Sequence, residues 1–140
     1  MRTARTGRSP AVALELPRNE MAFRMRYQEL LLARKITTVF RPGNRIYPNW
    51  RGYLEGETVS ARVIKRPGSD ALGIAPLFNE LSLPIRILSL TVTPVHALRP
   101  EDFLGSSPDV RDVPGLMAHL NEIYGEEVGQ VTRIHFRYEA

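Results

Sequence analysis

Residues 85–95, with the sequence IRILSLTVTPV, constrain the fold of this chain more than any other segment. The segment is rich in Ile, Leu and Val, which favour extended backbone, and apolar runs of this kind occur in strands that are covered on both faces. We therefore predict a central strand here, covered on both faces, with the other elements arranged around it. No apolar run approaches membrane-spanning length, so we expect no membrane contact.

Further strands are predicted where apolar and polar residues alternate, or where β-branched and aromatic residues cluster. Side chains two positions apart share one face of a strand, so such patterns give a buried and an exposed face. These segments are residues 21–26, 36–41, 58–65 and 130–138. In the last of them, Arg133, His135 and Arg137 form a basic face. Residues 71–83 follow no clean period, and we expect an irregular excursion there.

Two segments favour helix. Residues 27–34 combine three leucines with Gln28 and Glu29, which predicts two helical turns. Residues 113–124 carry an apolar stripe at helical spacing, and Asp112 is placed to cap the first turn. With a further short turn at residues 99–103, the chain has two or three helices and about five to six strands. This order predicts an α+β fold, a small, partly closed mixed β-barrel flanked by helices.

The length of 140 residues suits a single domain, which we place at residues 18–140. Residues 1–17 begin with a basic stretch and lack the long apolar core of a secretory signal, so we expect a mobile basic arm there. Cysteine is absent, and the fold must rest on packing rather than on disulfides. This composition suits a reducing compartment such as the cytoplasm.

Positive charge is concentrated in the front of the chain. Residues 1–51 hold 11 Arg or Lys against three acids, a net of +8, whereas residues 52–140 hold eight against 12, a net of −4. A basic half attracts polyanions such as RNA through the release of counterions, largely independently of sequence. The alternative is that the two halves neutralise each other within the fold.

The loop at residues 41–52 interleaves cations with aromatic rings. Its cations are Arg41, Arg45 and Arg51, and its rings include Tyr47 and Trp50. A loop of this composition could hold phosphates and stack bases. The same two rings could instead cap one end of the core.

Lys35 lies at the junction between the predicted helix at residues 27–34 and the strand at residues 36–41. It is one of two lysines among the 19 basic residues of the chain. Burial can bring the pKa of a lysine, but not that of an arginine, close to neutrality, so Lys35 is a candidate for proton transfer. The alternative is an ordinary solvated lysine.

Five motifs, taken in order, resemble the ASCH domains of the PUA-like superfamily. They are ARKITTVFR, a Gly-Glu pair that opens an alternating strand, LRPEDF, NEIY at the end of the predicted long helix, and TRIHFRY. The resemblance covers residues 21–138 and implies a small PUA-like β-barrel. Members of this family are mostly inferred to bind RNA, one branch hydrolyses N4-acetylcytidine, and others have been linked to ribonuclease activity.

The resemblance to the amidohydrolase branch assigns catalytic roles to three positions. Lys35 would act as the base, and Thr38, three residues later, as the nucleophile. The third group is a downstream acid, which one alignment places at Asp109 and another at Glu101 or Asp102. The chain would then be an N4-acetylcytidine amidohydrolase or a ribonuclease.

Two positions depart from the pattern of that branch. Ala33 stands where the branch has glycine, and Phe40 stands where it has arginine, with Arg41 one position later. An arginine displaced by one residue changes faces in a regular strand.

We therefore expect this chain to bind RNA or a modified nucleoside in a basic cleft around Lys35. Hydrolysis of N4-acetylcytidine is the alternative, and a protein-interaction module is a third reading. The three histidines lie on different elements without metal-ligand spacing, so we expect neither a metal nor another cofactor. The residues expected to contact RNA are Arg34, Lys35, Arg41, Arg45, Tyr47, Trp50 and Arg51.

Overall fold

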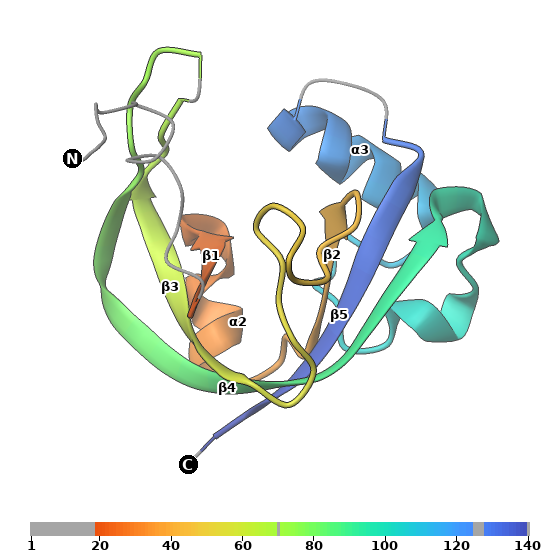
Figure 1. The fold of residues 1–140 in the computed structure, drawn as a ribbon, viewed down its shortest axis with the longest axis horizontal. Coiled ribbons are helices and arrows are strands. Elements are labelled where there is room, and N and C mark those ends of the chain that lie inside the picture. Colours follow the sequence, from red (N-terminus) through yellow and green to blue (C-terminus); the bar gives the residue numbers. More distant parts are fainter. Residues whose placement is uncertain (1–18, 70, 125–127, 140) are drawn as a thin grey trace.

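The computed structural model describes residues 19–69, 71–124 and 128–139, which form a strongly curled sheet with helices beside it (Figure 1). The expected basic arm at residues 1–17 lies outside these ranges. None of the helices within them is long and apolar enough to cross a membrane. The strands are β1 (Glu20–Arg24), β2 (Thr38–Pro42), β3 (Thr58–Arg66), β4 (Leu77–Pro94) and β5 (Gln130–Tyr138). The helices are α2 (Gln28–Leu32) and α3 (Val113–Tyr124), with 3-10 turns η1 (Met25–Tyr27), η2 (Val95–Ala97) and η3 (Pro100–Phe103).

The five strands lie in the order β1-β3-β4-β5-β2, so β4 is central, as the apolar segment predicts. β1 runs parallel to β3, and the other three pairs are antiparallel. The curl turns the two end strands, β1 and β2, toward each other without pairing them (Figure 1). The predicted α+β fold is therefore confirmed, in the form of a mixed half-barrel.

The irregular excursion predicted for residues 71–83 is wrong in its second half, because β4 already begins at Leu77. The first part of β4 forms a long hairpin with β3, in which Pro84 pairs with Ser60. Pairing between β4 and β5 begins only at Ile85, opposite Tyr138. Pro84 therefore lies at the end of the ladder with β5, where its missing N–H interrupts no hydrogen bond to that strand.

β4 is covered on one face only, which corrects the prediction that both of its faces are buried. Ile85 and Ile87 are fully buried, whereas Leu88 is 41% exposed. A register shift between Ile87 and Ser89 interrupts the alternation at this point. Antiparallel sheets commonly keep one face in water, and a chain with so few helices has little with which to cover the second face.

Two clusters of buried side chains hold the half-barrel together. The larger cluster lies inside the curl and includes Met21, Phe23, Ile87, Ile134 and Phe136. The second packs α3 and η3 against β2 and β5, and it includes Phe40, Phe103, Leu116, Leu120 and Val131. Because β2 and β5 contribute side chains to both clusters, they form the wall between the two cores.

α3 has the bounds and the cap that the sequence predicts. The backbone N–H of Gly115 donates to Asp112 Oδ1 at 2.8 Å, and that of Leu116 donates to the Asp112 carbonyl at 2.9 Å. Leu116 and Leu120 are the buried residues of its apolar stripe. The cap and the stripe together fix which side of α3 faces the sheet.

We expect Leu120→Ala to lower the free energy of unfolding by about 2–5 kcal/mol, because it removes a side chain that is 1% exposed and leaves a void. Leu104→Ala is the matched control, since Leu104 is 70% exposed, and its effect should stay within about 0.5 kcal/mol. Urea denaturation measures both changes. Equal effects of the two substitutions would contradict the position of α3 on the sheet.

Candidate functional site

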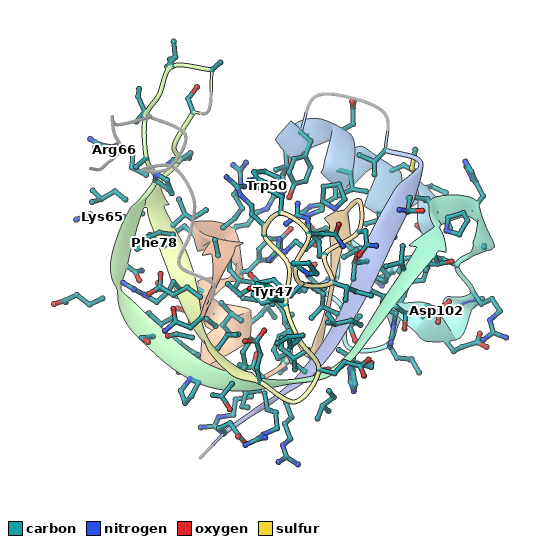
Figure 2. All side chains as sticks on the ribbon, viewed as in Figure 1. Tyr47, Trp50, Lys65, Arg66, Phe78 and Asp102 are labelled. Atoms are coloured by element: carbon teal, nitrogen blue, oxygen red, sulfur yellow. The ribbon has the colours of Figure 1, made fainter. Side chains whose placement is uncertain are left out.

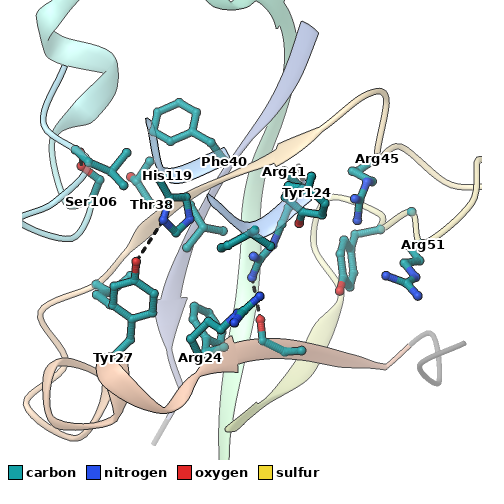
Figure 3. Close-up of a pocket in the computed structure, with 18 of the residues that line it drawn as sticks. Arg24, Tyr27, Thr38, Phe40, Arg41, Arg45, Arg51, Ser106, His119 and Tyr124 are labelled. Atoms are coloured by element: carbon teal, nitrogen blue, oxygen red, sulfur yellow. Dashed lines mark hydrogen bonds between the residues drawn. The ribbon is translucent and has the colours of Figure 1, made fainter. Parts of the chain in front are cut away.

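A cavity of about 680 Å³ lies between the end strands β1 and β2, the loop at residues 45–53, and α3 (Figure 3). Among the described residues, its wall contains one carboxylate, Glu20, which accepts a hydrogen bond from Arg62 at 2.9 Å. That acid is therefore already neutralised from outside the cavity. Four arginines also line the wall and give it an excess of positive charge: Arg24, Arg41, Arg45 and Arg51.

Arg41 spans the space between the two end strands. It projects from β2, and its guanidinium donates to the carbonyl oxygen of Ala22 on β1 at 2.7 Å. The same guanidinium lies 5.4 Å from the centre of the Phe23 ring, a cation-π contact. Arg41 thereby ties the two edges of the half-barrel together at the cavity.

The loop at residues 45–53 is held closed by its own backbone. Tyr47 N donates to the Tyr53 carbonyl at 3.0 Å, and Tyr53 N donates to the Arg45 carbonyl at 2.8 Å. Gly52 allows this close approach, because a Cβ at that position would lie 2.6 Å from Tyr47 N. The loop is anchored to the sheet where Arg45 N donates to Thr132 Oγ1 at 2.7 Å.

This loop presents an arginine-aromatic cluster to the cavity. The guanidinium groups of Arg45 and Arg51 lie 5.5 Å and 4.1 Å from the centre of the Trp50 ring. Arg45 is 7% exposed, whereas Trp50 is 55% exposed. Burial lowers the pKa of Arg45, yet an arginine stays charged at neutral pH. Figure 2 shows Tyr47 and Trp50 between the two sides of the curled sheet.

The positive charge that is concentrated in the front half of the sequence is distributed in two ways in the fold. Some cations of the basic half are neutralised by acids of the other half, as Arg26 is by Glu122 at 2.7 Å. The arginines of the cavity wall instead lie together around one space, with Trp50 among them. Partial neutralisation outside the cavity is therefore compatible with excess positive charge inside it.

The other end of the cavity carries a hydrogen-bonded chain of three side chains. Tyr27 OH donates to Asp109 Oδ2 at 2.7 Å, and His119 Nδ1 lies 3.2 Å from Tyr27 OH. Ser107 Oγ donates a further bond of 2.6 Å to Asp109 Oδ1. Tyr27 and His119 line the cavity, whereas Asp109 does not. The dashed line between Tyr27 and His119 in Figure 3 marks their contact.

The pKa values of this chain favour a carboxylate beside a neutral imidazole. Burial alone would raise the pKa of Asp109, but the hydrogen bonds from Ser107 and Tyr27 outweigh it, and that pKa is lowered. Burial lowers the pKa of His119 below 6.5, although the nearby Asp109 acts in the opposite direction. At neutral pH His119 is therefore uncharged, in contrast to the arginines at the other end.

Several residues predicted from the sequence lie on the cavity wall. Thr38, which is 1% exposed, comes from β2, and its Oγ1 lies 3.2 Å from His135 Nδ1. The others form the arginine part of the wall and the loop: Arg41, Arg45, Tyr47, Trp50 and Arg51.

The remaining predicted residues lie away from the wall. Lys35 and Arg34 are exposed, and the Arg34 guanidinium stacks 5.6 Å from the centre of the Tyr138 ring. Glu101 pairs with Arg99 on the surface.

The two alternative acids have structural partners. Asp102 accepts a bond from Arg99 N at the start of η3, and Figure 2 shows it far from Trp50. Asp109 is held by Tyr27 and Ser107, as described above. The structure therefore does not bring Lys35, Thr38 and an acid together at this cavity, and their catalytic roles stay predictions.

Sequence reasoning did not find the Tyr27–Asp109–His119 chain. Tyr27 and His119 are separated by 92 positions, and Tyr27 and Asp109 by 82, so no local spacing relates them. One sequence signal could have revealed this chain. His119 is polar, yet it lies next to Leu120 in the apolar stripe of α3. A histidine on the sheet-facing side of an amphipathic helix requires a polar partner in the fold.

Comparisons with known proteins identify the fold but no family. No family model matches the chain, and no curated protein matches it. The crystal structure of protein EF3133 from Enterococcus faecalis V583, assigned to the family DUF984, is similar with a TM-score of 0.52 and 12% sequence identity. The match covers 81% of this chain and 69% of that chain. At this identity the likeness shows a shared fold alone.

We expect the imidazole of His119 to titrate below pH 6.5 in the folded protein, because burial disfavours its charged form. Asp109→Asn should lower this pKa further, since it removes the carboxylate that most favours the imidazolium. The matched control is Glu122→Gln, which removes a carboxylate with a smaller influence on the imidazole and should change the pKa less. NMR detection of the ring proton over pH 4–8 measures all three midpoints, and a wild-type midpoint above 6.5 would contradict this assignment.

Proposed function

We propose that this protein binds single-stranded RNA or a nucleotide in the cavity between β1, β2, the loop at residues 45–53, and α3. The observation that carries the proposal is the presence of four arginines and the exposed ring of Trp50 in one cavity. Arginines bind phosphates, and bases stack on flat aromatic surfaces. The volume of about 680 Å³ lies within the roughly 300–1,000 Å³ that small-ligand sites occupy.

The rigidity of the loop supports this proposal. Arg45 is anchored by its backbone N–H to Thr132 and by Nε, which donates to the Pro42 carbonyl at 2.9 Å. A cation that is already buried and oriented loses little side-chain entropy when a phosphate binds beside it. The charge at this end of the cavity is therefore in place before a ligand arrives.

We also propose that the chain is a divergent member of the ASCH domain family. Its half-barrel agrees with the small barrel that the resemblance implies. Within the motif ARKITTVFR, Thr38 and Arg41 line the cavity, so the segment that carries the resemblance also contributes to the candidate site. Lys35, from the same motif, lies outside the wall.

Hydrolysis of N4-acetylcytidine is the second candidate function, and the position of Thr38 favours it. Its hydroxyl is the nucleophile that the resemblance implies, and it borders the cavity. Lys35 is exposed and lies outside the wall, so Thr38 would need a different base. Binding of RNA or a nucleotide requires no catalytic base, and we place it first for this reason.

The double variant Arg24→Gln/Arg51→Gln tests the binding proposal. It should weaken binding of a fluorescein-labelled single-stranded RNA by tenfold or more. The slope of log affinity against log salt should become shallower by about 0.7 for each phosphate that the variant no longer neutralises. Fluorescence anisotropy at several salt concentrations measures both quantities. Quenching of Trp50, the single tryptophan of the chain, gives an independent report of base stacking.

The matched control is Arg66→Gln/Arg137→Gln, which removes the same charge from exposed positions outside the cavity wall. This control should bind RNA nearly as well as the wild type. Equal weakening by both double variants would show a diffuse electrostatic effect, and binding that does not respond to salt would also contradict the proposal.

A nucleoside assay tests the second candidate. If the protein releases cytidine from N4-acetylcytidine, Thr38→Val should abolish turnover, because it keeps the shape of the side chain and removes the hydroxyl. Lys35→Ala should leave turnover within about twofold, since Lys35 lies outside the cavity wall. Chromatography of the nucleosides measures both outcomes. Absence of release by the wild type rejects this function, and abolished turnover in Lys35→Ala would restore Lys35 as the base.

A further inference from the structure

The cavity has two chemically different ends. Figure 3 shows Arg45 and Arg51 at one side, and Tyr27, Thr38 and His119 at the other, with Arg41 between them. One end carries fixed positive charge, whereas the other carries a phenol, a hydroxyl and a neutral imidazole. A ligand that fills both ends must itself have an anionic part and an uncharged, hydrogen-bonding part.

The hydrogen bonds around Tyr27 determine where the proton of His119 resides. Tyr27 has a single hydroxyl proton, and it donates that proton to the Asp109 carboxylate at 2.7 Å. The contact of 3.2 Å between Tyr27 OH and His119 Nδ1 is then a hydrogen bond only if Nδ1 carries the proton and donates it. In the neutral ring, Nε2 is consequently a hydrogen-bond acceptor.

The cation nearest to His119 does not reverse this assignment. One nitrogen of Arg26 lies 3.4 Å from Nδ1, a longer contact than the 3.2 Å between Nδ1 and Tyr27 OH, and the same nitrogen donates a bond of 2.7 Å to Glu122. The charged and titratable groups that face the imidazole are Tyr27 and Arg26 from η1, Asp109, Glu122 from α3, and Arg41 from β2. Two cations stand against two carboxylates, and burial decides the balance in favour of the neutral ring.

The side of the ring that carries Nε2 is directed away from Tyr27, toward the interior of the cavity (Figure 3). The His119 side chain is 12% exposed, so this acceptor is accessible chiefly to a molecule inside the cavity. Thr38 Oγ1 lies at the same end and can donate or accept.

We propose that the His119 end of the cavity reads the base of the bound nucleotide, with Nε2 of His119 accepting a hydrogen bond from an N–H group on the base edge. This inference rests on the proposed function and specifies its ligand. The phosphate lies at the Arg45 and Arg51 end, and the base enters the His119 end. Nucleotides whose base edge offers an N–H group bind, and nucleotides in which that group is alkylated are rejected.

Displacement of labelled RNA by nucleotides tests this subsite. The probes are the 5′-monophosphates of uridine, cytidine and adenosine, each compared with its alkylated counterpart: N3-methyluridine, N4,N4-dimethylcytidine and N6,N6-dimethyladenosine. For the nucleotide that binds most tightly, we expect alkylation to weaken binding by tenfold or more at pH 7.5. This preference should decline as the pH falls below 6.5, because protonated Nε2 becomes a donor.

Two variants separate hydrogen bonding from shape. His119→Leu keeps a similar volume but removes the acceptor, so the natural and alkylated nucleotides should bind within about twofold of each other. His119→Gln supplies an amide oxygen and should retain part of the preference. A preference that persists in His119→Leu would show that the alkyl group is rejected by shape, and it would overturn the inference.

The possible failures are distinguishable. If labelled RNA binds through the arginines but no nucleotide displaces it at millimolar concentration, or if natural and alkylated nucleotides bind equally to the wild type, the subsite is wrong and the binding function stands. If neither labelled RNA nor a nucleotide binds, or if binding is unaffected by Arg24→Gln/Arg51→Gln, the proposed function fails and the subsite fails with it.

Discussion

The hydrogen bond from the Arg41 guanidinium to the Ala22 carbonyl is the interaction on which the rest of the site depends. It joins β1 and β2, the two end strands of the curled sheet, through one side chain instead of a backbone ladder. A ladder between these strands would close the barrel, and side chains fill the interior of a barrel of this size. This bridge holds the edges in place and leaves the space between them for a ligand.

The position of this arginine explains the departure seen in the sequence. Adjacent residues of a strand point to opposite faces, so an arginine at position 41 rather than 40 reaches the other side of β2. Phe40 accordingly packs in the cluster beneath α3, where it contacts Phe103, and Arg41 extends across the cavity to Phe23 and Ala22. The shift by one residue therefore places the Phe40 ring in the core beneath α3 and brings the Arg41 cation to β1, the opposite end strand.

The sequence was sufficient to predict elements whose pattern is local. The span of α3, its Asp112 cap and the alternation of β5 depend on neighbouring residues, and they appear as predicted. The start of β4 was missed because Pro76 and Pro84 mask the period, although Pro84 lies where β5 does not yet pair. His119 and Tyr27 meet only through the packing of α3 against η1, which no spacing along the chain encodes.

Backbone strain distinguishes the loop at residues 45–53 from other turns. Arg51 adopts a left-handed φ of 55°, which costs a non-glycine residue about 1 kcal/mol. Arg34 has a φ of 58°, but it lies just after α2, where helices commonly end in this conformation. Arg51 follows no helix of the described chain.

The conformation of Arg51 is maintained by the backbone bonds that close the loop, and it places the guanidinium 4.1 Å from the centre of the Trp50 ring. Strain that persists beside a cavity is typical of ligand sites, and here it presents an arginine and an aromatic ring to the same space.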